Sequence, residues 1–293
     1  MDKDQLWIGT MLNGEARWVL ASTTHTVEEA RQRHQMLPVA TAALGRVMTG
    51  TLLMASTMKG AESITVRFLG DGPLGGVVAV GNALGEVRGY VHEPLCDIPL
   101  NFADKLDVGA AIGYGNLVVD RSLANGEVYS GTVPINTGEV GDDLVYYLSK
   151  SEQIPSALML GVLVAQDHHV ECSIGFLIQL LPGAQEEVIQ KIEALLSRFK
   201  GGVSHLGKDF NDMESLLAHF MGEYDYRVLE KRDVSFKCTC SKDRVANALK
   251  LLGKNEIADL VSDGQTEMIC HFCNEHYHFG EEELKALEAE VSQ

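Results

Sequence analysis

Four cysteines near the end of this chain limit its possible folds more than any other feature of the sequence. They form two tight pairs, Cys238-Thr-Cys240 and Cys270-His-Phe-Cys273. In an extended segment, side chains at positions i and i+2 point to the same side, so Cys238 and Cys240 are able to face one ligand. A Cys-x-x-Cys sequence at a turn supplies two more thiolates, and four thiolates at tetrahedral corners are typical ligands of structural zinc. The spacing therefore predicts one zinc ion bound by all four cysteines.

Other possible ligands play no part in this prediction. His271, His276 and His278 lie close to the second cysteine pair and are able to replace a thiolate. Because four cysteines already close a structural site, we expect these histidines at the surface or around the ligands. Cys96 lies in a loop flanked by prolines and Cys172 in an apolar stretch, so both are expected to be ordinary packed thiols.

Length and charge restrict the class of protein. The chain has 293 residues, enough for one large core and a smaller unit, and its net charge is −17. Residues 1–180, 181–230 and 231–293 each carry a net negative charge, which argues against nucleic acid as a partner. We expect no signal peptide and no membrane span, and clustered thiols in such a chain indicate reduced cysteines in the cytoplasm.

The pattern of residues 1–180 predicts an α+β core domain with an antiparallel sheet. Asn13-Gly14 predicts a hairpin turn, Thr26 with Glu29 a capping box that opens a helix, and Pro38 the start of a buried helix that ends near Gly60. Further expected elements are the strands Ser63–Leu69, Val77–Val80, Glu86–Val91, Leu117–Arg121, Glu127–Val133, Ala157–Val164 and Glu171–Leu181 and the helix Gly141–Lys150.

Pro182-Gly183 marks a domain boundary, and we interpret residues 181–231 as a helical linker. It holds two expected helices, Glu186–Phe199 and Met213–Met221, the second with a cap formed by Asn211 and Glu214. Residues 232–293 are expected to form the zinc domain: a short strand into Cys240, two helices, a strand into Cys270 and a last helix after Gly280.

The residues around the cysteines resemble a known family. Phe236-Lys-Cys-Thr-Cys-Ser-Lys-Asp-Arg244 and Met268-Ile-Cys-His-Phe-Cys-Asn-Glu-His-Tyr277 are similar to the two halves of the zinc switch of the heat shock protein 33 family, the redox-regulated bacterial chaperonins. Ile64-Thr-Val-Arg-Phe-Leu-Gly-Asp-Gly-Pro73 and Tyr147-Leu-Ser-Lys-Ser-Glu-Gln-Ile-Pro155 resemble segments of its core domain. With the length and domain order, the resemblance covers nearly the whole chain.

The resemblance implies a holdase chaperone that binds unfolding client proteins under oxidative and heat stress without ATP, and not an enzyme. It implies that oxidation forms disulfides between Cys238 and Cys240 and between Cys270 and Cys273. It also implies zinc release, unfolding of the switch domain, a mobile linker and a homodimer of the activated protein in the bacterial cytoplasm.

Exposure of the linker is a separate hypothesis. If its helices pack on the zinc unit, their apolar side chains lose cover when that unit unfolds and become able to hold clients. The alternative is that they pack on the core domain. The side chains concerned are Leu195, Leu196, Phe199, Leu216, Leu217, Phe220 and Met221.

Three other functions stay open from the residues alone. A thiol–disulfide oxidoreductase that uses Cys270 and Cys273 requires that pair at a helix N-terminus in a thioredoxin-like context. A nucleic-acid-binding zinc module is disfavoured by the acidic charge. A permanent structural zinc explains the site but not the use of an i, i+2 pair.

Overall fold

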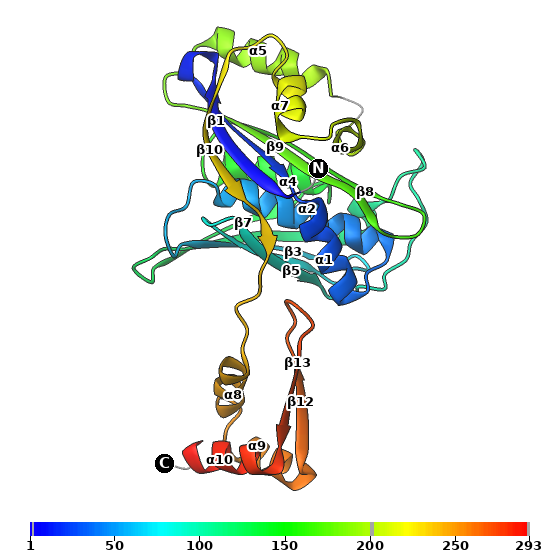
Figure 1. Ribbon diagram of the computed structural model, residues 1–293, viewed down its shortest axis with the longest axis vertical. Helices are drawn as coiled ribbons and strands as arrows, with labels where there is room; N and C mark the ends of the chain where they lie inside the picture. Colours follow the sequence, from blue (N-terminus) through cyan, green and yellow to red (C-terminus); the bar gives the residue numbers. More distant parts are fainter. Residues whose placement is uncertain (2, 200–201, 292–293) are drawn as a thin grey trace. The chain divides into compact units, whose positions relative to one another are not determined.

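The computed structural model describes residues 1, 3–199 and 202–291, with the side chains of residues 254–255 left aside. The chain divides into two compact units, Met1–Lys237 and Cys238–Gln293. Each unit has its own helices and strands, as Figure 1 shows. The predicted α+β class with antiparallel sheets is confirmed.

The first unit contains two sheets. The five-stranded sheet is antiparallel throughout, in the order β10-β1-β2-β9-β8. The six-stranded sheet has the order β11-β5-β4-β3-β6-β7 and is antiparallel except for the β11–β5 pair. The strands are β1 (Gln5–Met11), β2 (Ala16–Ser22), β3 (Ser63–Gly70), β4 (Val77–Asn82), β5 (Glu86–Val91), β6 (Gly115–Ser122), β7 (Val128–Ile135), β8 (Ser156–Val164), β9 (Val170–Leu180), β10 (Tyr226–Asp233) and β11 (Ser235–Phe236).

Helix α2 (Pro38–Ala55) lies between the two sheets and contacts strands of both (Figure 1). It is apolar and long enough to cross a membrane, with a mean hydropathy of 1.2, but 89% of it is buried inside the fold. The expected buried helix is therefore confirmed, although it ends at Ala55. Its small residues let neighbouring elements approach closely, since a Cβ at Gly50 would lie 2.5 Å from Leu144 Cδ1 and one at Gly45 would lie 3.0 Å from Val162 Cγ2 of β8. The other helices of this region are α1 (Thr24–His34), α3 (Val108–Ile112) and α4 (Val140–Lys150).

Two turns show how the chain enters these elements. The β1–β2 hairpin is confirmed, and a short 3-10 turn (Leu12–Gly14) with positive φ at all three residues joins its strands. The capping box is wrong, because α1 begins at Thr24. The backbone N–H and the hydroxyl of Thr26 instead donate to the buried carboxylate of Asp4, at 2.6 and 2.7 Å.

Residues 181–231 contain α5 (Glu186–Ser197), α6 (Leu206–Asp209), α7 (Met213–Met221) and most of β10. Both expected helices are present, but Asp212 caps α7, where its carboxylate accepts from the Ser215 N–H at 2.7 Å. The strand β10 was not expected from the sequence. It pairs with β1 along its whole length, which places this stretch in the first unit.

The apolar side chains of this segment form one core with the five-stranded sheet. The ring of Phe220 stacks on Phe176 of β9, with centroids 4.6 Å apart, and Leu195, Leu216 and Leu217 are fully buried in the same cluster. The hypothesis that they pack on the zinc unit is therefore wrong, and the alternative, packing on the core domain, is confirmed. In Figure 1, α5 and α7 lie over the face of this sheet opposite α2.

The second unit has little regular structure around its first two cysteines. The expected short strand into Cys240 is wrong, because the ladder ends at Phe236 and 237–241 form neither helix nor strand. The other expected elements are confirmed: α8 (Lys242–Lys250), α9 (Lys254–Asp263), β12 (Gln265–Ile269) and α10 (Glu281–Val291). The strand β13 (His276–Gly280), which pairs with β12, was not expected.

Candidate metal centre

The cysteines come from two irregular segments held by local hydrogen bonds. Ser241 caps α8 by accepting from the Arg244 N–H at 3.3 Å. The guanidinium of Arg244 donates to the carbonyl and hydroxyl oxygens of Thr239, both at 2.8 Å. Since Thr239 lies between the first two cysteines, these contacts fix the path of the Cys-x-Cys segment.

The second pair lies in the turn that joins β12 to β13. The carbonyl of Cys270 accepts from the N–H groups of Cys273 and Asn274, at 3.3 and 2.8 Å, and its N–H donates to the Glu275 carbonyl at 2.9 Å. Asn274 has φ 57°, a left-handed conformation that asparagine tolerates well. The chain thus reverses over Cys270–Cys273 and turns both thiols to the same side.

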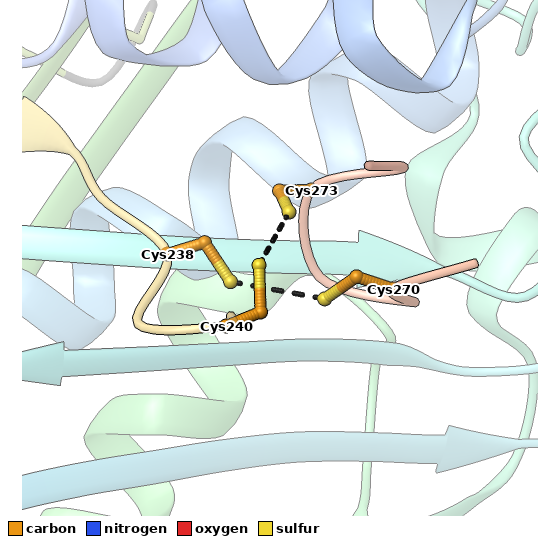
Figure 2. Close-up of side chains that lie close together, drawn as sticks. All are labelled: Cys238, Cys240, Cys270 and Cys273. Atoms are coloured by element: carbon orange, nitrogen blue, oxygen red, sulfur yellow. Dashed lines mark hydrogen bonds between the residues drawn. The ribbon is translucent and has the colours of Figure 1, made fainter. Parts of the chain in front are cut away.

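The four sulfur atoms converge (Figure 2). All lie within 4.8 Å of one another, with 3.3 Å between Cys240 and Cys273 and 3.8 Å between Cys238 and Cys270. Four sulfurs bound tetrahedrally at about 2.3 Å from a zinc ion lie roughly 3.8 Å apart. The donor set and its spacing therefore fit a tetrahedral metal ion. In the described part of the chain, this is the one group of three or more candidate ligands that lie so close together.

The thiols differ in their surroundings. Burial raises the pKa of Cys238 and of Cys273, the most deeply placed of the four. Burial also acts on Cys240, but hydrogen bonds from the Tyr277 hydroxyl and from neighbouring thiols outweigh it and lower its pKa. The Tyr277 hydroxyl lies 3.0 Å from Cys240 Sγ. Such donors around a ligand stabilise the thiolate form that a metal requires.

The remaining candidates lie elsewhere. Glu267 Oε1 on β12 lies 3.0 Å from His276 Nδ1 and 3.3 Å from His278 Nε2 on β13, so these two imidazoles contact a carboxylate. Cys96 and Cys172 are buried thiols of the first unit, as expected, and burial raises the pKa of Cys172 to about 11.

The setting of Cys270 and Cys273 differs from that of a thioredoxin-like pair. They follow a strand and lead into another, and no helix begins at them. The helix N-terminus that lowers the pKa of a catalytic cysteine is therefore missing from this described segment. Sequence reasoning missed Tyr277 and Arg244. Tyr277 lies 37 residues from Cys240 in the sequence, so nothing indicates their contact until the fold is known.

Comparisons with known proteins agree with this geometry. The model of the family described as "Hsp33 protein" matches residues 4–280. A 33 kDa chaperonin of Geobacillus kaustophilus is 46% identical, with 94% of both chains covered, and one of Staphylococcus aureus is 42% identical, with 98% of both covered.

A solved structure is also similar over nearly the whole length. The crystal structure of the 33 kDa chaperonin, or heat shock protein 33 homolog, of Thermotoga maritima has a TM-score of 0.92 and 35% identity, and the match covers 99% of this chain and 100% of that one. The family model and these relatives each span nearly the whole chain, both sheets and all four cysteines, and on that ground the chain belongs to the Hsp33 family of chaperones.

Proposed function

We propose that this chain is an ATP-independent holdase whose activity is switched on when a zinc site formed by Cys238, Cys240, Cys270 and Cys273 is oxidised. One observation carries the proposal: four thiols from two segments about thirty residues apart in sequence meet within 4.8 Å in a unit with a small core. When bound, zinc supplies a tetrahedral tie between the two segments and keeps the sulfurs as thiolates. The relatives are named chaperonins, which supports a non-enzymatic role.

The free energies of core packing and zinc binding indicate that the second unit unfolds when it loses the metal. The core of the second unit is built from Leu249, Phe279, Leu284 and Leu287. A unit of this size gains only about 3–5 kcal/mol from such a core. Structural zinc contributes on the order of 10–16 kcal/mol of apparent binding energy. Folding of Cys238–Gln293 therefore depends on the metal, and losing it unfolds the unit.

Oxidation separates the two cysteine segments only if each disulfide forms within one segment. We propose bonds between Cys238 and Cys240 and between Cys270 and Cys273. Each forms as one hydrogen peroxide takes two electrons from two thiolates and, with two protons from the solvent, leaves as two waters. Each such bond closes a loop of three or four residues, worth about 2 kcal/mol in the chain-entropy model. Crosswise pairs are also close, since the sulfurs of Cys240 and Cys273 lie 3.3 Å apart and those of Cys238 and Cys270 3.8 Å apart. Crosswise bonds would keep the two segments joined, so disulfide mapping by mass spectrometry separates a switch from a clamp.

Unfolding of the second unit reaches the first through the chain itself. Cys238 directly follows Lys237, whose N–H donates to the Val87 carbonyl next to β11, a strand of only two residues. Upstream, β10 is an exposed edge strand and leads back to α7. We propose the functional division into a core domain (1–180), a linker (181–231) and a switch domain (232–293), in which the linker is released after the switch unfolds. Its release uncovers the sheet face around Phe176 and Trp18 for unfolded clients. The activated chain acts as a homodimer in the cytoplasm.

The test is a paired aggregation assay on the full chain. Zinc-loaded reduced protein and peroxide-treated protein are each mixed with a thermally unfolding client, and released zinc is followed with a colorimetric chelator. We expect suppression of light scattering only in the treated sample, in step with zinc release. Equal suppression before and after peroxide, or reduced protein without stoichiometric zinc, would contradict the proposal. Peroxide-treated protein that is reduced again in the presence of zinc is the matched control and is expected to lose activity.

A further inference from the structure

The β12–β13 hairpin of the second unit has one packed face and one exposed face. Tyr277 and Phe279 belong to the packed face and contact the small apolar core of this unit. Successive side chains of a strand point to opposite sides, so the residues between them lie on the other face. There Glu267, His276 and His278 are all exposed. The solvent face of the hairpin thus carries two imidazoles and a carboxylate.

The register of the hairpin brings these three side chains together. Glu267 is paired directly with His278, and His276 lies two positions earlier on the same strand. The Oε1 atom of Glu267 lies 3.0 Å from Nδ1 of His276 and 3.3 Å from Nε2 of His278. Nitrogen and oxygen ligands bound to one zinc ion at about 2.1 Å lie roughly 3.0–3.4 Å apart. Both contacts therefore have the spacing of neighbouring ligands on one cation.

The partners of Glu267 differ from those of other glutamates in this unit. Among the ion pairs of the described residues, those of Glu267 are made with the two imidazoles alone. Glu281 and Glu283, on the neighbouring helix α10, pair with lysines. A neutral imidazole offers a lone pair to a metal ion, whereas an ammonium group offers none and repels a cation. The surroundings of Glu267 are therefore suited to receiving a cation.

The three groups have room to close around an ion. A cavity of about 530 Å³ lies along the hairpin and is lined by Glu267 and His278 among others. Among the described residues, only the four cysteines form a group whose ligand atoms all lie within 4.8 Å of one another, so the imidazoles approach Glu267 from different sides. One ring must turn to complete the site. The side chain of His278 is 76% exposed, so packing does not hold its ring in place.

We propose that Glu267, His276 and His278 bind a second metal ion, a first-row divalent cation of the Zn²⁺ and Ni²⁺ class, with water at its remaining positions. Two imidazoles and one carboxylate suit such cations, whereas Mg²⁺ and Ca²⁺ prefer oxygen ligands. The three ligands meet only while β12 and β13 are paired, so the cation binds the folded second unit and stabilises it. Under the proposed function, it therefore slows the unfolding that follows oxidation.

The direct test is a titration of the full, reduced chain with Ni²⁺ after its cysteines have been loaded with zinc. Native mass spectrometry should show one nickel added to one retained zinc, and calorimetry gives the affinity. Because Ni²⁺ is paramagnetic, the amide resonances of Glu267, His276 and His278 should broaden most. Mg²⁺ is the control and should not bind. Nickel that replaces the zinc, or broadening that is strongest elsewhere, overturns the proposal.

Matched variants test the same ligands. His278→Ala and Glu267→Gln each remove one donor from the exposed face, and each should weaken Ni²⁺ binding by at least about tenfold, the lower end of what losing an outer contact of a metal site costs. Zinc at the cysteines should stay at one per chain. His169→Ala is the control, because His169 also contacts a carboxylate, that of Asp167, but without a second imidazole. Wild-type affinity in His278→Ala overturns the assignment.

The effect on stability is measured by the rate at which peroxide releases zinc. Bound Ni²⁺ should slow this release in the wild type and not in His278→Ala, and an equal effect in both contradicts the proposal. The outcomes also separate this site from the proposed function. If nickel binds the hairpin but the oxidised chain holds no client, the second site stands without the switch. If the oxidised chain holds clients but nickel does not bind the hairpin, the switch stands and the second site fails.

Discussion

The core of the first unit surrounds α2, a helix whose side chains are almost all buried between two sheets, and a second cluster fills the space under α5 and α7. The second unit has no comparable interior: its cluster consists of four buried side chains with partly buried neighbours, and Leu251, Leu252 and Ile269 are exposed. Its two halves meet instead at four sulfurs. The first unit is stabilised by burial, which oxidants do not alter. Under the proposed function, metal ligands that oxidants remove stabilise the second unit, and the same chain then combines a permanent fold with a conditional one.

The largest expected effect comes from removing one ligand. Cys240→Ser should abolish stoichiometric zinc binding and unfold the second unit, because the metal contributes on the order of 10 kcal/mol, more than the unit's core. Circular dichroism should show loss of the helices α8, α9 and α10. Cys96→Ser, which alters a buried thiol of the first unit, is the control and should keep full zinc. A folded second unit in Cys240→Ser would show that this unit, like the first, does not depend on the metal for its stability.

Truncating a core side chain should have the opposite effect, destabilising the first unit and leaving zinc binding by the second unchanged. Phe220→Ala removes a ring stacked on Phe176 beneath α7 and should cost about 3–5 kcal/mol of the first unit's stability, without affecting zinc content. Urea unfolding measures the cost. Leu229→Ala, at an exposed position of β10, is the control and should change stability by less than about 0.5 kcal/mol. Zinc loss in Phe220→Ala would show that the two units are not independent in this respect.

The hydroxyl next to the metal site should have an intermediate effect. Tyr277→Phe removes the donor 3.0 Å from Cys240 Sγ, and such outer contacts typically change metal affinity about 10–100-fold. Competition with a chelator should show weaker zinc binding, and peroxide should release zinc sooner. Tyr114→Phe, an exposed tyrosine of the first unit, is the control. An unchanged zinc affinity in Tyr277→Phe would show that the four sulfurs alone determine zinc binding.

A carboxylate of the first unit should give the smallest effect, visible through pH. Burial acts to raise the pKa of Glu28, but hydrogen bonds from Arg31, the Val170 N–H and Gln32 outweigh it and lower the pKa. A lowered folded pKa stabilises the protein above the unfolded value of about 4.5, and this stabilisation is lost as pH falls through the folded pKa. Glu28→Gln should therefore cost about 1 kcal/mol at pH 7 and less at pH 3.5 in urea unfolding. Glu29→Gln, which alters a more exposed i, i+4 pair with Arg33, is the control and should cost less than about 0.5 kcal/mol at pH 7. A cost for Glu28→Gln that is equal at both pH values would contradict this origin.

The sequence predicted most elements because the signals are local. Pro38 pre-sets the backbone for the first turn of α2, and Asn13-Gly14 provides the left-handed residues of a hairpin turn. The strand β10 escaped prediction because its exposed, charged residues lack an alternating pattern and its partner β1 lies more than two hundred residues away in sequence. The start of α1 was misplaced because the buried Asp4 uses Thr26 for a tertiary contact. Long-range pairing of this kind has no signature in a short window of sequence.

The donor set follows from the residues alone: four cysteines at spacings that suit one tetrahedral ion, in an acidic chain that resembles a chaperone family. The folded structure adds that the sulfurs are within reach of one another crosswise as well as locally, that Tyr277 donates to Cys240, and that the helices after Pro182 cover the five-stranded sheet. The reason is physical: ligand type and spacing are properties of the chain, whereas contacts between distant segments depend on which surfaces are buried together.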